Sequence, residues 1–133
     1  ISRRLSTQAP TYKSKELTDP EKVFKFMRSK VADYKKERLY VISLNTKSWT
    51  VAEISLGTLD SILTHPREAF SEAIKNNASS VIFVHNHPSG DTEPSQEDIE
   101  LTRQMVKAGE LLGIEVLDHL IITKQNFRSI IKE

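Results

Sequence analysis

The sequence predicts one mixed α/β (α+β) domain in which helices alternate with short strands. Three segments carry apolar residues at the spacing of an amphipathic helix, and several shorter runs are rich in the β-branched and aromatic residues that strands favour. The length of 133 residues suits a single domain. A chain of this size buries roughly two thirds of its unfolded surface, so we expect one substantial hydrophobic core.

Composition and charge restrict the function classes. Lys and Arg number 19 against 18 Asp and Glu, a net charge of +1, whereas nucleic-acid-binding domains usually have a clearly basic balance. The lack of cysteine excludes disulfides and thiolate metal sites and is consistent with a reducing cytoplasm. The sequence has neither a signal peptide nor an apolar run of the roughly 18 residues that a membrane span needs. We therefore expect a cytoplasmic protein without membrane association.

The chain divides into a leading segment and one domain. Residues 1–15 are polar and lack periodicity, so we expect a flexible N-terminal segment before a single domain at residues 16–133. Residues 18–21 predict the start of the first helix, because they combine a capping residue, an early Pro and an acid. Its predicted core face consists of Val23, Phe24, Phe26, Met27, Val31 and Tyr34.

A hairpin and a second helix are predicted next. Residues 39–44 and 49–54 have strand composition and flank the turn residues 45–48, a pattern typical of a β-hairpin. Gly57-Thr58 indicates a turn or a close backbone approach. Pro66 begins the second helix, whose predicted inward residues are Phe70, Ala73 and Ile74.

Candidate metal ligands follow the most apolar strand. Residues 81–84 predict a buried strand that leads into His85 and His87, which point to the same face because their spacing is two. After a turn, Ser95 opens a helix whose first turn carries Asp98. Two imidazoles and a carboxylate form a ligand set that zinc prefers in catalytic sites, with a fourth position left for water.

Each half of this pattern also has a simpler interpretation. Two histidines at a strand end are often a surface pair, and Ser95 followed three residues later by Asp98 is an ordinary capping pattern. Directly after the strand, the histidines, the turn and the helix start nevertheless converge within fourteen residues. Capping and metal binding are also compatible, so we favour the metal site.

The spacing His85-x-His87-x7-Ser95-x2-Asp98 resembles the JAMM (MPN/JAB1) metalloprotease signature. The resemblance extends over about residues 16–131 and is specifically to the bacterial RadC branch, through residues 57–58, 65–68, 87–90, 93–95 and 117–119. It implies a mixed β-sheet flanked by helices, as in cytidine deaminases and JAB1/MPN domains. It also implies a Zn²⁺ held by His85, His87 and Asp98, with hydrolysis of peptide or isopeptide bonds.

The resemblance also implies a catalytic pair. In the family, the general base lies where the first helix gives way to the first strand, which is Glu37 here. Without the resemblance, Glu37 would be taken as a solvated acid in the charged run 35–38, and Glu53 and Glu68 are its rivals. Ser95 lies next to the fourth metal position, where it could hydrogen-bond the oxyanion of a tetrahedral intermediate.

The remaining elements complete the predicted domain. A long helix ends at Gly113, followed by a buried strand at residues 114–123 and an edge strand within 127–131. Asp118 and His119 lie in this buried strand and need partners, either as a hydrogen-bonded core pair or as groups that orient a zinc-bound histidine. The predicted inward residues of the long helix are Ile99, Leu101, Met105, Val106, Ala108, Leu111 and Leu112.

Three function classes follow from these observations. The motif favours a zinc peptidase or isopeptidase. RadC-like proteins have historically been linked to DNA repair, but their usual helix-hairpin-helix-like N-terminal region is not found in these 133 residues. A non-catalytic MPN interaction module is the third class, although the complete motif argues against it. Neither the substrate nor the oligomeric state follows from the sequence.

Overall fold

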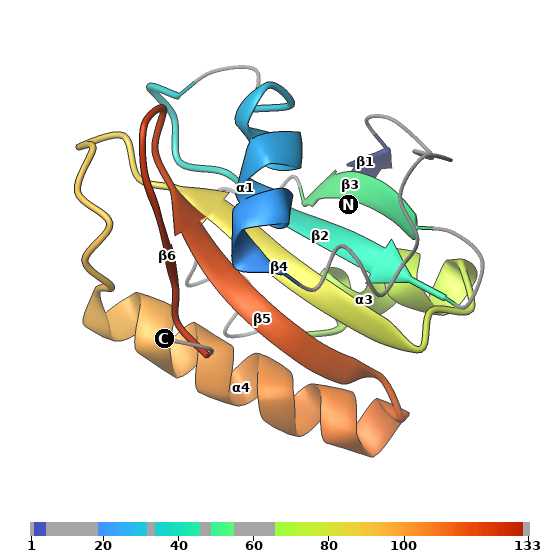
Figure 1. The fold of residues 1–133 in the computed structure, drawn as a ribbon. Helices are drawn as coiled ribbons and strands as arrows, with labels where there is room; N and C mark the ends of the chain where they lie inside the picture. The colour runs from blue at the N-terminus through green and yellow to red at the C-terminus, as the bar shows by residue number, and fades with distance from the viewer. Residues whose placement is uncertain (1, 5–18, 32–33, 46–48, 55–65, 132–133) are drawn as a thin grey trace.

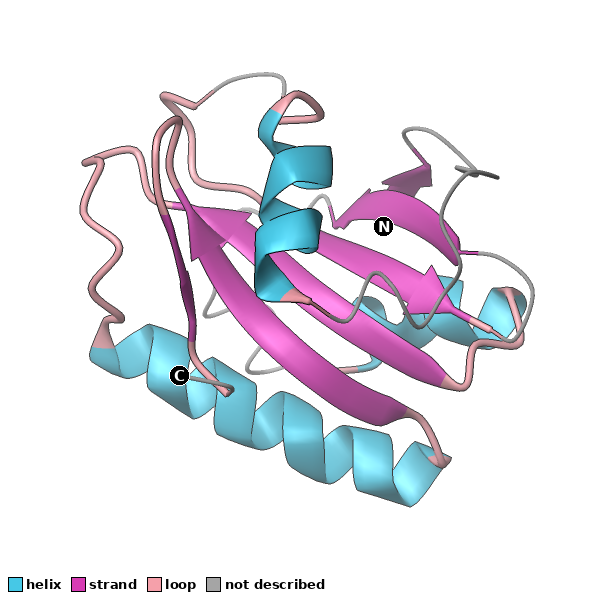
Figure 2. Cartoon of the chain, in the orientation of Figure 1, coloured by secondary structure: helices cyan, strands magenta, loops and turns pink. Residues whose placement is uncertain are grey.

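The strands of the computed structural model form one sheet, with helices on both faces (Figures 1 and 2). The structure describes residues 2–4, 19–31, 34–45, 49–54 and 66–131. The helices are α1 (Pro20–Arg28), α3 (Arg67–Lys75) and α4 (Gln96–Leu112). The strands are β1 (Ser2–Arg4), β2 (Leu39–Leu44), β3 (Trp49–Ile54), β4 (Ser80–Asn86), β5 (Glu115–Ile122) and β6 (Phe127–Ser129). This arrangement confirms the predicted mixed α/β class.

The sheet is mixed, in the order β1-β3-β2-β4-β5-β6. The β2–β3 pair is the predicted antiparallel hairpin, and β4 pairs antiparallel with β2. On its other side β4 pairs parallel with β5, and α4 makes the crossover between these two strands. β4 therefore lies inside the sheet, and the loop that follows its C-terminal end leads to the start of α4 (Figure 1).

Alternating side chains on the central strands build one core on each face of the sheet. On one face, Tyr40 and Ile42 of β2 and Ile82 of β4 pack with the buried residues of α1. On the other face, Val41 and Phe83 pack with the buried residues of α3 and α4. All residues of β2 are buried, as expected of a central strand covered on both faces.

Local signals explain the ends of the helices. Asp19 caps α1 by accepting a hydrogen bond from the amide of Glu21, at 3.0 Å. Gly113 ends α4 with φ 74°, a left-handed conformation that glycine adopts without a Cβ penalty. α1 ends at Arg28, earlier than the apolar pattern suggested, so the buried Val31 and the half-buried Tyr34 lie beyond the helix.

Some predictions about inward residues were wrong. In α3, Ile74 is 54% exposed, and the core face is instead made by Ala69, Phe70 and Ala73. Towards the end of α4, Leu111 is 90% exposed, and Ile99 and Leu112 are also exposed. The buried positions of α4 are Asp98, Leu101, Thr102, Met105 and Gly109. They form a narrow stripe, because only one side of this helix meets the sheet.

Part of the predicted layout falls on the N-terminal segment and on residues that the structure does not describe. Strand β1 lies within the N-terminal segment predicted to be flexible, and it pairs with β3. Residues 46–48, 57–58 and 65, which carried predicted turns and part of the family resemblance, lie outside the described residues. Within the described part of the chain, no helix is long and apolar enough to cross a membrane.

Candidate metal centre

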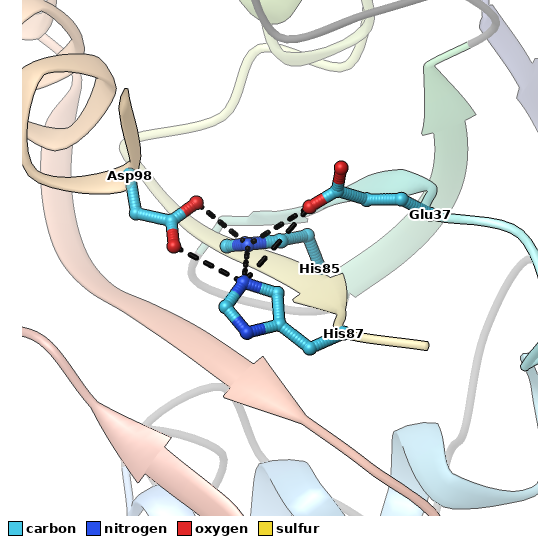
Figure 3. Close-up of side chains that lie close together, drawn as sticks. All are labelled: Glu37, His85, His87 and Asp98. Atoms are coloured by element: carbon cyan, nitrogen blue, oxygen red, sulfur yellow. Dashed lines mark hydrogen bonds and ion pairs between the residues drawn. The ribbon is translucent and has the colours of Figure 1, made fainter. Parts of the chain in front are cut away.

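Four titratable side chains meet at the C-terminal end of β4 (Figure 3). They are Glu37, His85, His87 and Asp98, and one ligand atom of each lies within 4.8 Å of those of the others. The Nε2 atoms of His85 and His87 are 3.0 Å apart. Their common direction follows from the strand, because residues two apart share a face.

The first turn of α4 aims Asp98 at the two imidazoles. Ser95 and Asp98 form a reciprocal capping box: the Ser95 amide donates to Asp98 Oδ2 at 2.7 Å, and the Asp98 amide donates to Ser95 Oγ at 3.0 Å. The Asp98 side chain is fully buried. Its Oδ1 lies 2.9 Å from His85 Nε2, yet it makes no hydrogen bond of acceptable angle to any described group. A buried carboxylate oxygen therefore faces the histidines without a donor.

A hydrogen-bond chain behind His85 assigns its tautomer. The Thr102 hydroxyl donates its only proton to the Asp98 carbonyl at 2.8 Å, so in its 2.6 Å contact with His119 Nδ1 it must accept. His119 is neutral, because burial holds its pKa well below the usual range. Its Nε2 is then an acceptor, and it receives the Nδ1 proton of His85 at 2.8 Å. In a neutral His85 ring, Nε2 then presents a lone pair to the cluster.

His87 also turns its Nε2 atom towards the cluster, and a single hydrogen bond to the backbone orients its ring. Its Nδ1 donates to the carbonyl of Asp91 at 2.8 Å, which leaves the lone pair of a neutral ring on Nε2. In neutral rings both Nε2 lone pairs face the Asp98 carboxylate, an arrangement of like partial charges, whereas protonation of His87 lets its Nε2 donate to Asp98 Oδ2 at 3.1 Å. A cation between these atoms would remove the repulsion. Two imidazole nitrogens and a carboxylate fit Zn²⁺ by donor type, and the hydrogen bonds to the opposite ring nitrogens are those that usually orient metal-bound histidines.

Electrostatics also favour a cation in this place. Burial by itself would raise the pKa of Asp98, but His85 and His87, when their Nε2 atoms carry protons and donate to the carboxylate, outweigh burial and hold this pKa well below the usual range. The same contact with Asp98 raises the pKa of His87, against the effect of desolvation. Asp98 is therefore ionised at neutral pH, and its charge attracts a proton or a metal ion to the histidines.

Glu37 completes the cluster from the segment before β2. Its Oε2 lies 3.7 Å from His85 Nε2 and 3.9 Å from His87 Nε2, further than the Asp98 oxygens, and its side chain is 44% exposed. A solvent-accessible carboxylate at this distance suits proton transfer better than coordination. Of its rivals, Glu68 lies outside the cluster, near Arg67. The side chains of β3, which carries Glu53, lie outside the described part of the structure.

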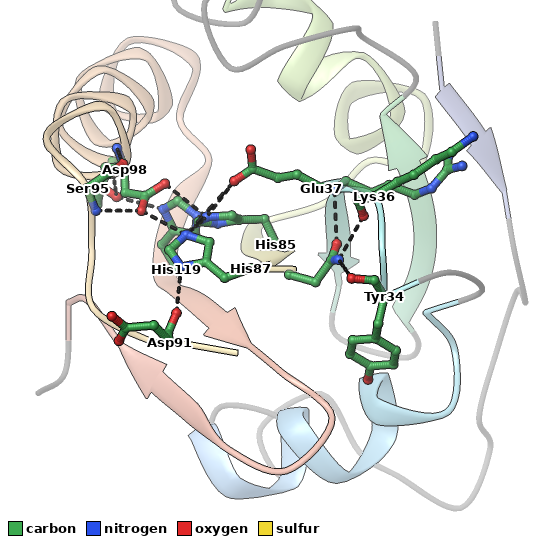
Figure 4. A network of polar contacts seen from close by, with 12 residues as sticks. Tyr34, Lys36, Glu37, His85, His87, Asp91, Ser95, Asp98 and His119 are labelled. Atoms are coloured by element: carbon green, nitrogen blue, oxygen red, sulfur yellow. Dashed lines mark hydrogen bonds and ion pairs between the residues drawn. The ribbon is translucent and has the colours of Figure 1, made fainter. Parts of the chain in front are cut away.

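Asn86, between the two histidines, holds the segment that carries Glu37. Figure 4 labels Lys36 and Glu37 of this segment beside the two histidines. Its Oδ1 accepts from the Arg38 amide at 2.9 Å, and its Nδ2 donates to the Lys36 carbonyl at 2.8 Å. The residues on both sides of Glu37 are thus tied to one fully buried amide. The sequence analysis missed this residue, although a polar side chain at the end of a buried strand was a signal that it needs partners.

Asp118 and His119 have different structural roles. Asp118 accepts from the hydroxyl of Ser129, at 2.7 and 2.8 Å to its two oxygens, and from the backbone amides of His119 and Ile131. It therefore attaches β6 to β5, as a hydrogen-bonded core residue. His119, by contrast, contacts His85 directly, so of the two only His119 can orient a candidate ligand.

This fold and cluster define a class of protein, the mixed α/β domains with a JAMM-type His-His-Asp cluster beside a glutamate. The sequence pattern of the RadC-like JAB domain matches residues 17–133. The chain belongs to the RadC-like JAB domain family.

Curated relatives support the same assignment. The chain is 47% identical over 126 residues to the UPF0758 protein TTE0897 of Caldanaerobacter subterraneus, covering 92% of this chain and 53% of that protein. It is 45% identical over 120 residues to SH1266 of Staphylococcus haemolyticus, covering 89% and 53%. It is 42% identical over 132 residues to Mbar_A2303 of Methanosarcina barkeri, covering 98% and 57%. The chain thus spans about half the length of these relatives, whose names state no activity.

Proposed function

We propose that this domain is a zinc-dependent hydrolase that cleaves peptide or isopeptide bonds. His85, His87 and Asp98 would hold the metal, and Glu37 would act as general base and then as general acid. The observation that carries the proposal is the close approach of three donor atoms: the Nε2 atoms of His85 and His87 lie 3.0 Å apart, and a buried Asp98 oxygen without a hydrogen bond lies 2.9 Å from His85 Nε2.

The chain's own residues account for the proton transfers. A bound zinc ion would supply a Lewis acid that activates water at neutral pH. Glu37, half-exposed beside the cluster, would take a proton from that water and deliver it to the leaving amine. Asn86 would keep the Glu37 carboxylate in place through its two backbone contacts, so that the carboxylate needs little reorganisation.

Ser95 is proposed as the oxyanion donor. Its Oγ already accepts the Asp98 amide proton, so its own hydroxyl proton is available for a substrate oxygen. Losing such a donor costs on the order of 3 kcal/mol in the barrier. Losing the cap would cost about 1 kcal/mol in stability. A Ser95→Ala variant that keeps its zinc but is much slower would support the catalytic role, and equal rates would exclude it.

The first test is zinc stoichiometry by elemental analysis of the purified protein, with His87→Ala and Asp98→Ala beside it. We expect about one zinc per chain in the parent and none in either variant. Peptide and isopeptide substrates would then be screened against Glu37→Gln, which should retain zinc and lose hydrolysis. If the reconstituted parent held no tight metal, the hydrolase proposal would be abandoned for a binding module.

A further inference from the structure

A pocket of about 300 Å³ opens beside the metal cluster and shares His87 with it. Three segments line it. Tyr34 and Lys35 come from the chain before β2, Pro88 and Gly90 follow His87 after β4, and residues 123–125 form the turn between β5 and β6. Its volume lies at the lower end of the range for small-ligand sites, enough for one or two side chains. The function proposed above does not use this pocket.

Hydrogen bonds fix the walls of the pocket. On one side, the Tyr34 hydroxyl donates to the Arg28 carbonyl at 2.7 Å, and Asn86 Nδ2 donates to the Tyr34 carbonyl at 3.5 Å. On the other side, Thr123 Oγ1 accepts the amides of Gln125 and Asn126 at 3.3 and 3.0 Å. A turn closed by its own side chain is preorganised, so little conformational entropy is lost when a ligand binds.

The lining is positively charged. Among the eight described lining residues are two lysines, Lys35 and Lys124, and no acid. Lys124 Nζ lies 6.0 Å from the centre of the Tyr34 ring, within range of a cation–π contact. Because Tyr34 is itself held by Arg28, this contact keeps the Lys124 ammonium at the pocket.

We propose that this pocket is a substrate subsite for an anionic side chain, and that the preferred substrate is a peptide with an acidic residue close to the scissile bond. The inference rests on the proposed function, since it takes the cluster as the point of cleavage. An acidic peptide fits better than a nucleic acid. A phosphate backbone is normally bound by a row of cations, whereas this pocket has two lysines and the chain a net charge of +1.

Matched hydroxamates test the subsite separately from catalysis. The monohydroxamates of succinic and glutaric acid carry a free carboxylate, and their monoamide counterparts are neutral and of nearly the same shape. Each is titrated into zinc-loaded protein by calorimetry. Lys35→Gln and Lys124→Gln remove the pocket charges one at a time. Lys36→Gln is the matched control, because Lys36 is an exposed neighbour that does not line the pocket.

We expect the parent to bind the acid hydroxamate more tightly than the matching amide in at least one pair. Each pocket variant should lower this ratio of affinities by about 2- to 5-fold, the effect typical of an exposed ion pair. Lys36→Gln should leave the preference unchanged, and 1 M salt should weaken it. Equal binding of the acid and the amide in both pairs would overturn the subsite while leaving the metal centre intact. No binding of any hydroxamate would instead refute the function on which the subsite rests. Preferential binding of the oligonucleotide dT12 over the acidic probes, lost in both pocket variants, would overturn the acidic-peptide assignment in favour of nucleic acid.

Discussion

Replacing Thr102 by valine tests the hydrogen-bond chain that assigns the tautomer of His85. Valine has nearly the shape of threonine, so the change removes the hydroxyl without leaving a large cavity. The hydroxyl contacts His119 Nδ1 at 2.6 Å and the Asp98 carbonyl at 2.8 Å. His119 is 1% exposed, so water cannot replace the lost partner.

Loss of the Thr102 hydroxyl should lower either the folding free energy or the zinc affinity, and both can be measured. If His119 keeps its proton on Nδ1, a buried donor is left without a partner, which costs about 1–3 kcal/mol of folding free energy. If the proton moves to Nε2, it meets the Nδ1 proton of His85, and His85 must shift its own proton to Nε2. The lone pair proposed to bind zinc is then occupied. Loss of such an orienting contact typically weakens metal binding by about 10- to 100-fold.

The assay is competition for zinc with a chromophoric chelator, combined with denaturant unfolding of the metal-free protein. Thr102→Ser keeps the hydroxyl and is the matched control. It should bind zinc within a few-fold of the parent, whereas Thr102→Val should lose affinity, stability or both. If Thr102→Val matched the parent in both measurements, the tautomer assignment for His85 would be wrong.

Three further predictions concern other parts of the structure. Asn86→Ala should keep its zinc but lose most of its hydrolytic rate, because Glu37 is no longer held; an unchanged rate in a peptide-cleavage assay would contradict this role. Metal-free protein should lose stability as pH falls below 6.5, because burial lowers the pKa of His119, so the unfolded chain takes up a proton that the folded one does not. His119 contributes at most about 1.4 kcal/mol per pH unit to the change in unfolding free energy. This contribution should be missing when the unfolding of His119→Gln is measured across the same pH range. An unchanged pH dependence in the variant would argue against it. Gly109→Ala should destabilise the fold by about 1–3 kcal/mol, since the new methyl group would press on the Ile114 carbonyl; a melting temperature equal to the parent's would mean that α4 shifts freely.

Much of the fold could be predicted because its signals are local. The cap at the start of α4, the glycine that ends it and the short apolar run of β4 each act within a few residues. Side-chain direction along α4 was harder to predict. Leu111 and Leu112 continue the apolar pattern, but they lie off the stripe that meets the sheet, so hydrophobicity alone misplaced them.

The sequence alone grouped His85, His87 and Asp98, because strand and helix geometry place such residues together over a short stretch of chain. Their roles as ligands, and that of Glu37 as base, stay predictions. Only the tertiary structure paired His85 with His119, 34 residues away, and Arg38 with Asn86, 48 residues away. It also brought Lys124 to the wall of the pocket beside His87. These contacts depend on strand order, and strand order is decided by how both cores pack at once rather than by local propensity.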